Sequence, residues 1–324
     1  MKRFLVVSLI LVLGLTLTLV GCTPKEETPQ DQTQYITIAT GGTGGVYFPL
    51  GGKLAELFNK HIPNMRAGAQ STGASIANVA FLKDSKVELA FIQNDIAYYA
   101  YMGTEMFKDK KVDNFLALAT IYNEVVQLVV RADAGINAIE DLKGKKVAVG
   151  AAGSGTEANA RQILNTFGVQ YSDLGQAAFL SFSEAEAGLR DNTIDAAFIT
   201  SGTPTAAVIN MANSINVKVL PVAGPNATTL MNNFKHYAVA TIPANTYKNQ
   251  TEAVETVAVR AMIVVRKDLP DTLVYNMTKA LFDTGYADWK AGHARANDLT
   301  LATAQIGNPI PLHPGAKKYF DEKK

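Results

Sequence analysis

Cysteine is almost absent from this chain: Cys22 is the only one among 324 residues. An intrachain disulfide and a thiolate metal site are therefore both excluded, and a hydrophobic core alone must stabilise the fold. Histidine is nearly as scarce. The four histidines are far apart and form no paired-ligand motif such as HExxH, so no metal site is expected; they are His61, His236, His293 and His313.

Charged residues are also few, at 18% of the chain, against 48% hydrophobic residues. Lys and Arg total 30 and Asp and Glu total 29; without Lys2 and Arg3 the balance is 28 − 29 = −1. A near-neutral chain without a long basic run gives no reason to expect nucleic acid as a partner. The hydrophobic fraction is sufficient for one large or two medium domains.

One long apolar run is present, at the amino terminus. It spans residues 4–20 and follows Lys2 and Arg3. Its last two residues begin the segment Leu19-Val20-Gly21-Cys22, which has the form of a bacterial lipobox. We predict a lipoprotein signal peptide over 1–21 and diacylglyceryl modification of Cys22, although seventeen residues approach a short membrane span. Two acyl chains suffice for stable membrane anchoring. Polar, Pro-containing residues 22–34 are predicted to be a disordered tether.

The body of the chain contains the same pattern twice. Tyr35–Thr40 alternates like a strand, a glycine loop follows, and an amphipathic helix comes next. Lys146–Gly150 begins a second copy with its own glycine loop and helix. Each copy also contains an acidic-apolar strand, Glu88–Ile92 and Asp195–Ile199. Strands alternating with helices predict parallel α/β sheets, and two such units predict two lobes.

Two β-rich stretches are candidates for the connections between these lobes. We predict hinge strands at 125–131 and 256–266, lobe 1 from 35–124 and 267–324, and lobe 2 from 132–255. The fold class predicted from these patterns is therefore α/β, with two lobes joined by two hinge strands. A chain that crosses twice between lobes forms a hinge, and a ligand is expected in the cleft between them.

Ligands of open α/β sheets bind beyond the carboxyl ends of the strands. The loops predicted there are rich in glycine and hydroxyl groups, and glycine allows the backbone and helix N–H groups to approach an anion closely. Tyr47 and Tyr122 are expected to close over the ligand. Ser71 and Thr156 have the alternative role of ordinary helix N-caps. The predicted ligand-binding residues are Thr43, Gly44, Gly45, Tyr47, Ser71, Thr72, Gln93, Asn94, Tyr122, Ser154, Gly155, Thr156, Thr200, Gly202 and Pro204.

Enzymatic motifs match less well. Gly153-Ser154-Gly155-Thr156-Glu157-Ala158 fits the short dinucleotide pattern, and Asp173 has nearly the spacing of its ribose-binding acid, but no strand end is evident at Asp173. Ser154 lacks the flanking glycines of a nucleophile elbow. No stretch fits a phosphate-binding P-loop. We therefore predict no catalytic residue and no cofactor.

Six motifs in one order resemble the TAXI-type solute receptors of tripartite ATP-independent periplasmic (TRAP) transporters. They are Thr40–Tyr47, Gln70–Ser75, Ala90–Asp95, Gly150–Glu157, Ala240–Pro243 and Pro311–Ala316. Ala74-Ser75 stands where family members often have Gly-Ser. Gly202-Thr203-Pro204 stands where they often have Gly-Ile-Pro, which leaves the role of Thr203 open.

The resemblance implies a two-lobed, periplasmic-binding-protein-like (type II) fold. It also implies a receptor without catalysis that closes on a small carboxylated solute such as glutamate, glutamine or a dicarboxylate. It further implies delivery to integral membrane permease subunits driven by an ion gradient. The sequence leaves three alternatives: a solute-binding lipoprotein of an ABC importer, an extracytoplasmic enzyme, or a surface antigen.

Overall fold

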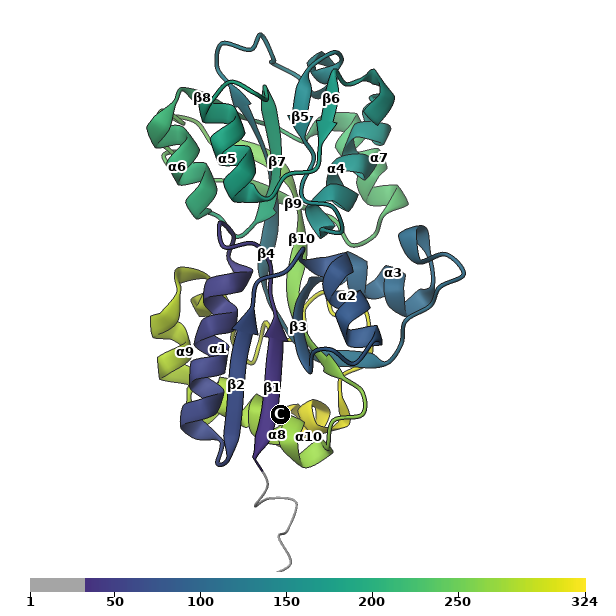
Figure 1. Cartoon of the computed structure of the whole chain (residues 1–324), viewed down its shortest axis with the longest axis vertical. Coiled ribbons are helices and arrows are strands. Elements are labelled where there is room, and N and C mark those ends of the chain that lie inside the picture. Colours follow the sequence, from purple (N-terminus) through teal and green to yellow (C-terminus); the bar gives the residue numbers. More distant parts are fainter. Residues whose placement is uncertain (1–32) are drawn as a thin grey trace, which may run out of the picture. The chain divides into compact units, whose positions relative to one another are not determined.

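The computed structural model describes residues 33–324, which form one compact unit (Figure 1). The predicted signal peptide, the lipidation of Cys22 and nearly all of the predicted tether lie outside these residues. Gln34, the last residue of that tether, already belongs to the first strand.

The first half of the chain contains four strands and three helices. Its elements are β1 (Gln34–Ala39), α1 (Tyr47–His61), β2 (Met65–Gln70), α2 (Ser75–Lys83), β3 (Leu89–Gln93), α3 (Asn94–Met102) and β4 (Phe115–Arg131), with a 3-10 turn at Glu105–Phe107. Leu50, Leu54 and Leu57 give α1 its buried face, at the spacing of an amphipathic helix.

The second half repeats the alternation and then returns to the first. Its elements are β5 (Lys146–Ala148), α4 (Gly155–Thr166), β6 (Gln176–Ala178), α5 (Phe182–Arg190), β7 (Ala196–Ser201), α6 (Ala206–Ser214), β8 (Val217–Leu220), α7 (Gly224–Asn233), β9 (Ala238–Ile242), β10 (Val254–Arg266), α8 (Asp271–Lys279), α9 (Tyr286–Gly292) and α10 (Pro314–Glu322). Shorter 3-10 turns lie at Ile139–Leu142, Tyr171–Asp173 and Ala294–Asp298, and a π-helical turn at Ala280–Thr284.

The strand order shows the internal repeat directly. The sheet runs β2-β1-β3-β10-β4-β7-β5-β6. The first half is β2-β1-β3 with parallel pairing, and the second half reads β6-β5-β7 from the opposite edge, again parallel. The repeat predicted from the two glycine loops is thus present in the topology. We call the part containing β1–β3 lobe 1 and the part containing β5–β7 lobe 2.

Two long antiparallel strands, β4 and β10, run through both lobes (Figure 1). On β10, Val254–Ala258 pairs with β9 in lobe 2, whereas Ala261–Val265 pairs with β3 in lobe 1. On β4, Val125–Val130 pairs with β7. The register of the β4–β10 ladder shifts between Arg260 and Met262, where the chain passes from one lobe to the other. The exact lobe boundaries remain a prediction.

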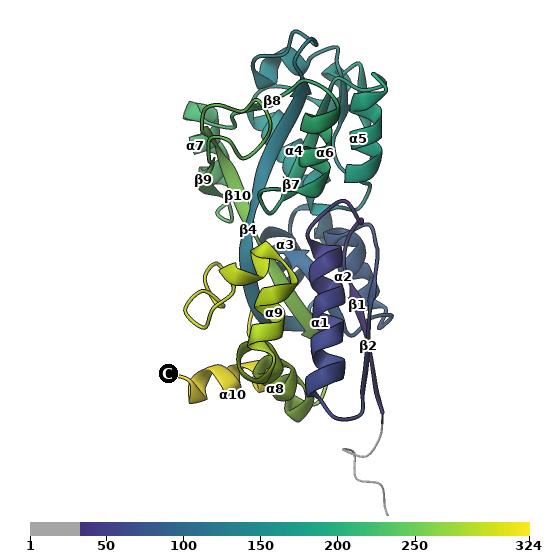
Figure 2. The same cartoon turned by 90° about the vertical axis from the view of Figure 1, so that its left-hand side faces the viewer.

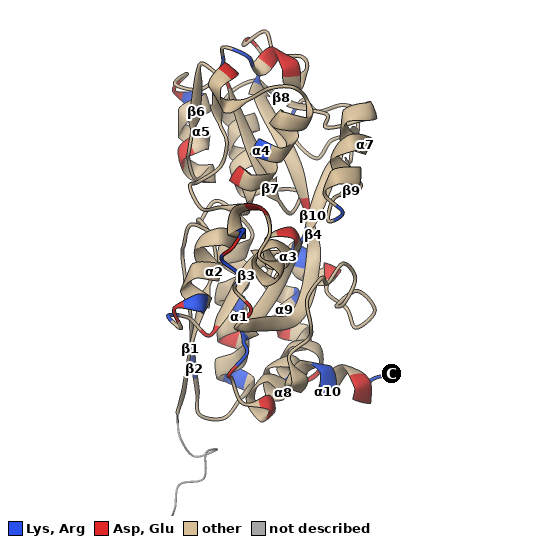
Figure 3. Cartoon of the chain, turned by 90° about the vertical axis from the view of Figure 1, so that its right-hand side faces the viewer, with Lys and Arg blue, Asp and Glu red and all other residues tan. Residues whose placement is uncertain are grey.

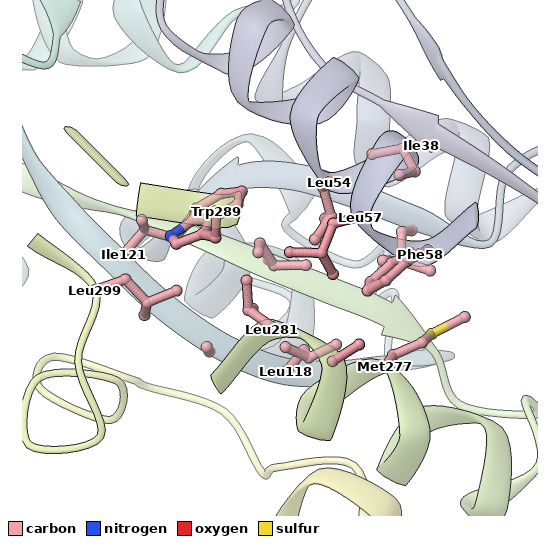
Figure 4. Close-up of a cluster of buried hydrophobic side chains, with 14 of the residues drawn as sticks. Ile38, Leu54, Leu57, Phe58, Leu118, Ile121, Met277, Leu281, Trp289 and Leu299 are labelled. Carbon is pink, nitrogen blue, oxygen red and sulfur yellow. The ribbon is translucent and has the colours of Figure 1, made fainter. Parts of the chain in front are cut away.

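The core of lobe 1 lies between α1 and the β4–β10 pair (Figure 4). Leu54, Leu57 and Phe58 of α1 meet Leu281 and Trp289 from the carboxyl-terminal helices, and all five are almost completely buried. Each such side chain contributes on the order of 2 kcal/mol through burial. Figure 2 shows α8 and α9 beside α1, so the last part of the chain completes lobe 1.

Some predicted element boundaries differ from the structure. β4 begins at Phe115, whereas the predicted strand begins at Val125; its added residues are nearly all buried and pair with β10. α3 begins at Asn94, directly after β3. The Asn94 side chain holds the start of this helix against β10, because its Oδ1 accepts from Asp95 N at 3.0 Å and from Arg260 N at 2.9 Å.

Acidic and basic residues are spread over both lobes, without one large area of a single sign (Figure 3). Among residues 33–324, no helix is long and apolar enough to cross a bilayer. The same residues contain no group of three or more His, Cys, Asp or Glu side chains arranged to hold a metal ion.

Candidate functional site

A cavity of about 70 Å³ lies where the carboxyl ends of the parallel strands of both lobes meet. The loop after β1, the start of α2 and the end of β3 form its lobe 1 wall. The loop after β5, the start of α4, the start of α5 and the end of β7 form its lobe 2 wall. The lining residues are Gly41, Gly42, Gly45, Val46, Tyr47, Thr72, Gly73, Ala74, Ser75, Gln93, Glu124, Ala151, Ser154, Gly155, Thr156, Ser181, Phe182, Thr200 and Ser201.

Glu124 of β4 is the carboxylic acid of this lining, and its residue is 3% exposed. The Tyr47 hydroxyl donates to its Oε2 at 3.1 Å and the Tyr122 hydroxyl to its Oε1 at 3.2 Å. Burial raises the pKa of Glu124 to about 8, although hydrogen bonds from Gln93, Tyr47 and Tyr122 lower it. Since no lysine or arginine lines the cavity, the ionised carboxylate has no counter-charge in the wall.

Two polar atoms at the cavity have no hydrogen-bond partner within the described chain. Gln93 Oε1 and Thr200 Oγ1 are both buried, in residues that are 2% and 4% exposed. They come from the carboxyl ends of β3 and β7, which are equivalent positions in the two halves. Because a buried polar atom without a partner costs about 1–3 kcal/mol, these two atoms favour a polar ligand between them.

The amino end of α4 provides donors on the lobe 2 side. Ser154 is the N-cap, and its hydroxyl accepts from Glu157 N at 3.1 Å. Gly155 and Thr156 occupy the first turn, where N–H groups have no intrahelical acceptor. Gly150 has φ +99°, and a Cβ there would approach Glu157 N to 2.8 Å. Glycine at position 150 therefore lets the loop after β5 pass close to the first turn of α4 without a steric clash.

The amino end of α2, on the lobe 1 side, is bonded across the lobes. The Gly153 carbonyl accepts from Ile76 N and Ala77 N, both at 3.0 Å. Nearby, a Cβ on Gly44 would approach Ser183 Oγ to 2.8 Å. The backbone of lobe 2 thus docks directly on the first turn of α2, whereas Gly155 and Thr156 of the first turn of α4 line the cavity.

A second buried acid, Asp95 of α3, bridges the lobes behind the cavity. Its Oδ2 accepts from Asn159 Nδ2 of α4 at 2.9 Å. The same Asn159 amide contacts the Tyr237 hydroxyl at 2.8 Å, and Tyr237 donates to Gln162 Oε1 at 2.8 Å. Burial raises the pKa of Asp95 to about 7. Lobe contact therefore includes a carboxyl group that titrates near neutral pH.

The structure brings many of the predicted ligand-binding residues together, although their contact with a ligand remains a prediction. Those that line the cavity are Gly45, Tyr47, Thr72, Gln93, Ser154, Gly155, Thr156 and Thr200. Ser154, rather than Thr156, is the N-cap of α4. The Thr72 hydroxyl binds Thr40 O at 2.9 Å and Asn78 Oδ1 at 2.6 Å, so it also supports its own loop.

The other predicted residues lie outside the lining. Tyr122 is behind Glu124 and Gly44 is in the lobe contact, whereas Asn94 ties α3 to Gly307 O at 3.0 Å. The Ser71 hydroxyl donates to Gly41 O at 3.0 Å instead of capping a helix. The remaining residues are Thr43, Gly202 and Pro204, of which Thr43 and Pro204 are exposed. Thr203, whose role the sequence left open, is half-buried and also outside the lining.

The sequence analysis missed Glu124 and the loop before α5, including Ser181 and Phe182. Both had a signal. Glu124 is an isolated acid in an otherwise largely apolar run, Phe115–Arg131. Ser181-Phe182-Ser183-Glu184 is a capping box, and the structure forms it; it marks the helix start that corresponds to α2.

The dinucleotide-like motif at Gly153–Ala158 does begin a helix after a strand. Asp173, its candidate ribose ligand, caps a 3-10 turn instead, accepting from Gln170 N at 2.9 Å. It does not follow a strand end as the dinucleotide fold requires. This local geometry leaves the motif without its acidic partner.

Residues 38–323 match the model of the NMT1-like family, which is nearly the whole described chain. The chain belongs to the NMT1-like family. The TAXI type predicted from the six motifs is a narrower assignment than this family match.

Solved structures share the fold at low sequence identity. A protein from Bordetella bronchiseptica RB50 is 15% identical, covers 89% of this chain and 88% of its own, and has a TM-score of 0.54. PhnD1 from Prochlorococcus marinus (MIT 9301), in complex with methylphosphonate, is 13% identical over 77% of this chain and 84% of its own, with a TM-score of 0.51. The predicted two-lobed, periplasmic-binding-protein-like α/β fold is confirmed.

Proposed function

We propose that this protein is an extracytoplasmic solute-binding receptor that captures a small carboxylated solute by closure of its lobes. The observation that carries this proposal is the cavity between the lobes, where buried Gln93 Oε1 and Thr200 Oγ1 have no hydrogen-bond partner among residues 33–324. Enclosed sites of this kind, with a few convergent polar groups, are typical of small-molecule binding.

The start of α4 supports a carboxylate as the group bound on lobe 2. First-turn N–H groups and the positive end of the helix dipole stabilise an anion without an arginine. Thr156, Thr200 and Ser201 add hydroxyl groups to the same wall. Glutamate, glutamine and related acids are the solutes that the TAXI resemblance favours.

We further propose delivery to membrane permease subunits of the TRAP (TAXI) type. The predicted lipid anchor at Cys22 would keep the receptor beside such a permease, and a polar tether would allow it to dock. The neighbouring genes separate this partner from the ABC-importer alternative. A gene for a large multi-span permease supports a TRAP transporter, whereas a gene for an ATPase supports an ABC importer.

A thermal-shift panel of amino acids and small organic acids tests the receptor function. A ligand at a hundredfold excess over Kd stabilises the protein by about 2.7 kcal/mol, which raises Tm by about 5 °C or more. Absence of a shift with every small acid would contradict the proposal.

Thr200→Val then tests whether the responding ligand occupies this cavity. Valine keeps the shape of threonine and removes a hydroxyl without a partner, so the ligand-free protein should be at least as stable. Affinity should fall about tenfold, because one hydrogen bond to the ligand is lost. The control is Thr229→Val on α7, an exposed site outside the lining, which should leave affinity unchanged. An equal effect of both substitutions would place binding elsewhere.

A further inference from the structure

We propose that Glu124 and Gln93 form a subsite for an ammonium group, so that the solute is an amino acid rather than a dicarboxylate. This inference rests on the proposed receptor function and specifies the chemistry of its solute. It starts from an arrangement that carboxylate binding alone leaves unexplained: a buried carboxylic acid in the wall of a site for an acid.

The geometry presents acceptors to the cavity from lobe 1. Glu124 lines the cavity, and both of its oxygens are held by phenol hydroxyls, Tyr47 at 3.1 Å and Tyr122 at 3.2 Å. Each carboxylate oxygen can accept more than one hydrogen bond. Gln93 Oε1 is a second buried acceptor and has no partner within the described residues. An ammonium group has three donors and no acceptor, which matches this pair.

The charge of the walls discriminates between solute classes. Lysine, arginine and histidine are absent from the lining, and Glu124 is its carboxylic acid. When Glu124 is ionised, a dicarboxylate would add two negative charges next to it, with no lysine or arginine among the described residues of the lining. An amino acid brings the missing positive charge to lobe 1 and places its carboxylate at the α4 start in lobe 2. The two walls together therefore match a zwitterion.

Binding of the ammonium group should release a proton. Burial raises the pKa of Glu124 to about 8, and the charge of Asp95, when ionised, raises it further. Tyr47 and Tyr122 also face the carboxyl, and the positive charge of Arg295 lowers the pKa of Tyr122. Near neutral pH, the protonated Glu124 carboxyl gives its proton to water and the resulting carboxylate pairs with the incoming ammonium. An ammonium ligand lowers the pKa of Glu124 in the complex, and linkage requires this proton exchange.

The first experiment compares solutes that differ in the ammonium group. Isothermal calorimetry on the purified full chain uses L-glutamate and L-glutamine beside glutarate and 2-oxoglutarate, which retain the carboxylates but lack the ammonium. At least one of the two amino acids should bind about a hundredfold tighter than the deaminated acids. If the deaminated acids bind as tightly or more tightly, the ammonium subsite is overturned while the receptor function stands.

The second experiment replaces the Glu124 side chain. Glu124→Gln should weaken amino-acid binding about a hundredfold and leave glutarate binding unchanged or stronger. Glu255→Gln makes the same change at an exposed position of β10 and should leave all affinities unchanged. Wild-type amino-acid affinity in Glu124→Gln would overturn the proposal. Circular dichroism and an unfolding curve show that the variant folds.

The third measurement is independent of the absolute affinity. Amino-acid binding at about pH 6.5 is measured in buffers with different ionisation enthalpies, which reports protons released. The wild type should release about one proton for each ligand bound, and Glu124→Gln none. Proton uptake by the wild type, or equal release by both proteins, overturns the ammonium assignment. If no amino acid and no organic acid binds, the receptor function itself fails.

Discussion

The two halves of the sheet share one strand order but present different chemistry to the cavity. Lobe 1 contributes acceptors, Gln93 Oε1 and the Glu124 carboxyl. Lobe 2 contributes the first turn of α4 and the hydroxyls of Thr156 and Thr200. The amino end of α2, which corresponds to that of α5 in the repeat, is bonded to Gly153 O and cannot serve a ligand in this arrangement.

Because the two walls differ, a fold built from two similar halves can fit an asymmetric solute. Two equal anion-binding walls would favour a solute with acids at both ends. One acceptor wall and one donor wall favour a solute with a positive and a negative end. In the proposed site, the side chains that line the cavity, rather than the shared topology, set the specificity.

The largest expected change in solute affinity comes from a substitution that holds the lobe 1 and lobe 2 walls of the cavity apart. Gly155→Ala would place a Cβ within 1.9 Å of Gln93 Oε1, so either the amide of Gln93 or the lobe must move. We expect solute affinity to fall about a hundredfold, because such overpacking costs about 1–3 kcal/mol. The added methyl group would also displace Gln93 Oε1, the acceptor proposed to bind the solute. Calorimetry with the solute identified by the panel measures this.

The matched control is Gly52→Ala, in α1. A Cβ there meets nothing within 4 Å, so Kd should not change and α1 should gain up to about 1 kcal/mol from the better helix former. An unchanged Kd in Gly155→Ala would mean that the two walls do not need to meet as closely as Gly155 and Gln93 do here.

The second effect concerns the carboxyl that joins the lobes. Because the pKa of Asp95 is raised from 3.8 to about 7, the folded state keeps a proton that the unfolded chain loses. The free energy of unfolding should therefore fall as pH rises from about 4 to about 7, by on the order of 1 kcal/mol per pH unit. Glu124, whose pKa is raised from 4.5 to about 8, adds a slope of the same sign that continues to about pH 8.

Asp95→Asn tests this assignment. The amide retains a polar group opposite Asn159 but does not titrate, so the fall in stability between about pH 4 and pH 7 should become shallower. Urea unfolding at a series of pH values measures the slope for both proteins. The same slope in both would show that Asp95 is not the titrating group. The slope that Glu124 contributes should remain in Asp95→Asn and continue to about pH 8.

The smallest effect is at Ala74, which lines the lobe 1 wall at the start of α2. Its backbone has φ 69° and ψ −146°, a region that glycine adopts readily and alanine does not. Such strain costs about 1–3 kcal/mol, and glycine returns up to about 1 kcal/mol of it through the entropy of the unfolded chain. Ala74→Gly should thus stabilise the protein by about 1 kcal/mol in denaturant unfolding.

Ala77→Gly is the matched control in the same helix. There the backbone is helical, so glycine should destabilise by about 1 kcal/mol. If both substitutions destabilise, Ala74 is not strained, and its replacement of the glycine often found in TAXI-type receptors has another basis.

Most of the fold was predictable because its signals are local. The alternation of Tyr35–Thr40 and the spacing of Leu50, Leu54 and Leu57 reflect the periods of strands and helices directly. The full length of β4 was harder to predict from the sequence. Phe115–Thr120 is buried on both faces and paired with β10, so its hydrophobic run has no alternation that distinguishes a strand from a buried helix.

The site was predictable only in part, for a different reason. Ser154, Gly155 and Thr200 follow strands in sequence, so the strand-end rule finds them. Glu124 does not end a strand; it lies within β4, where that strand passes between the lobes. Its hydrogen bond with Tyr47, far away in the chain, and the lack of lysine and arginine among the described lining residues depend on the tertiary structure.

By itself, the sequence determined the α/β alternation, the internal repeat and the glycine and hydroxyl groups of the loops, because these follow from short-range periodicity and backbone freedom. Only the tertiary structure decided which helix start faces the cavity and which is bonded across the lobes. It also decided that Glu124 is buried without a counter-charge. Burial and charge neighbours arise from contacts between segments distant in the chain, and those contacts give Glu124 and Asp95 their shifted pKa values.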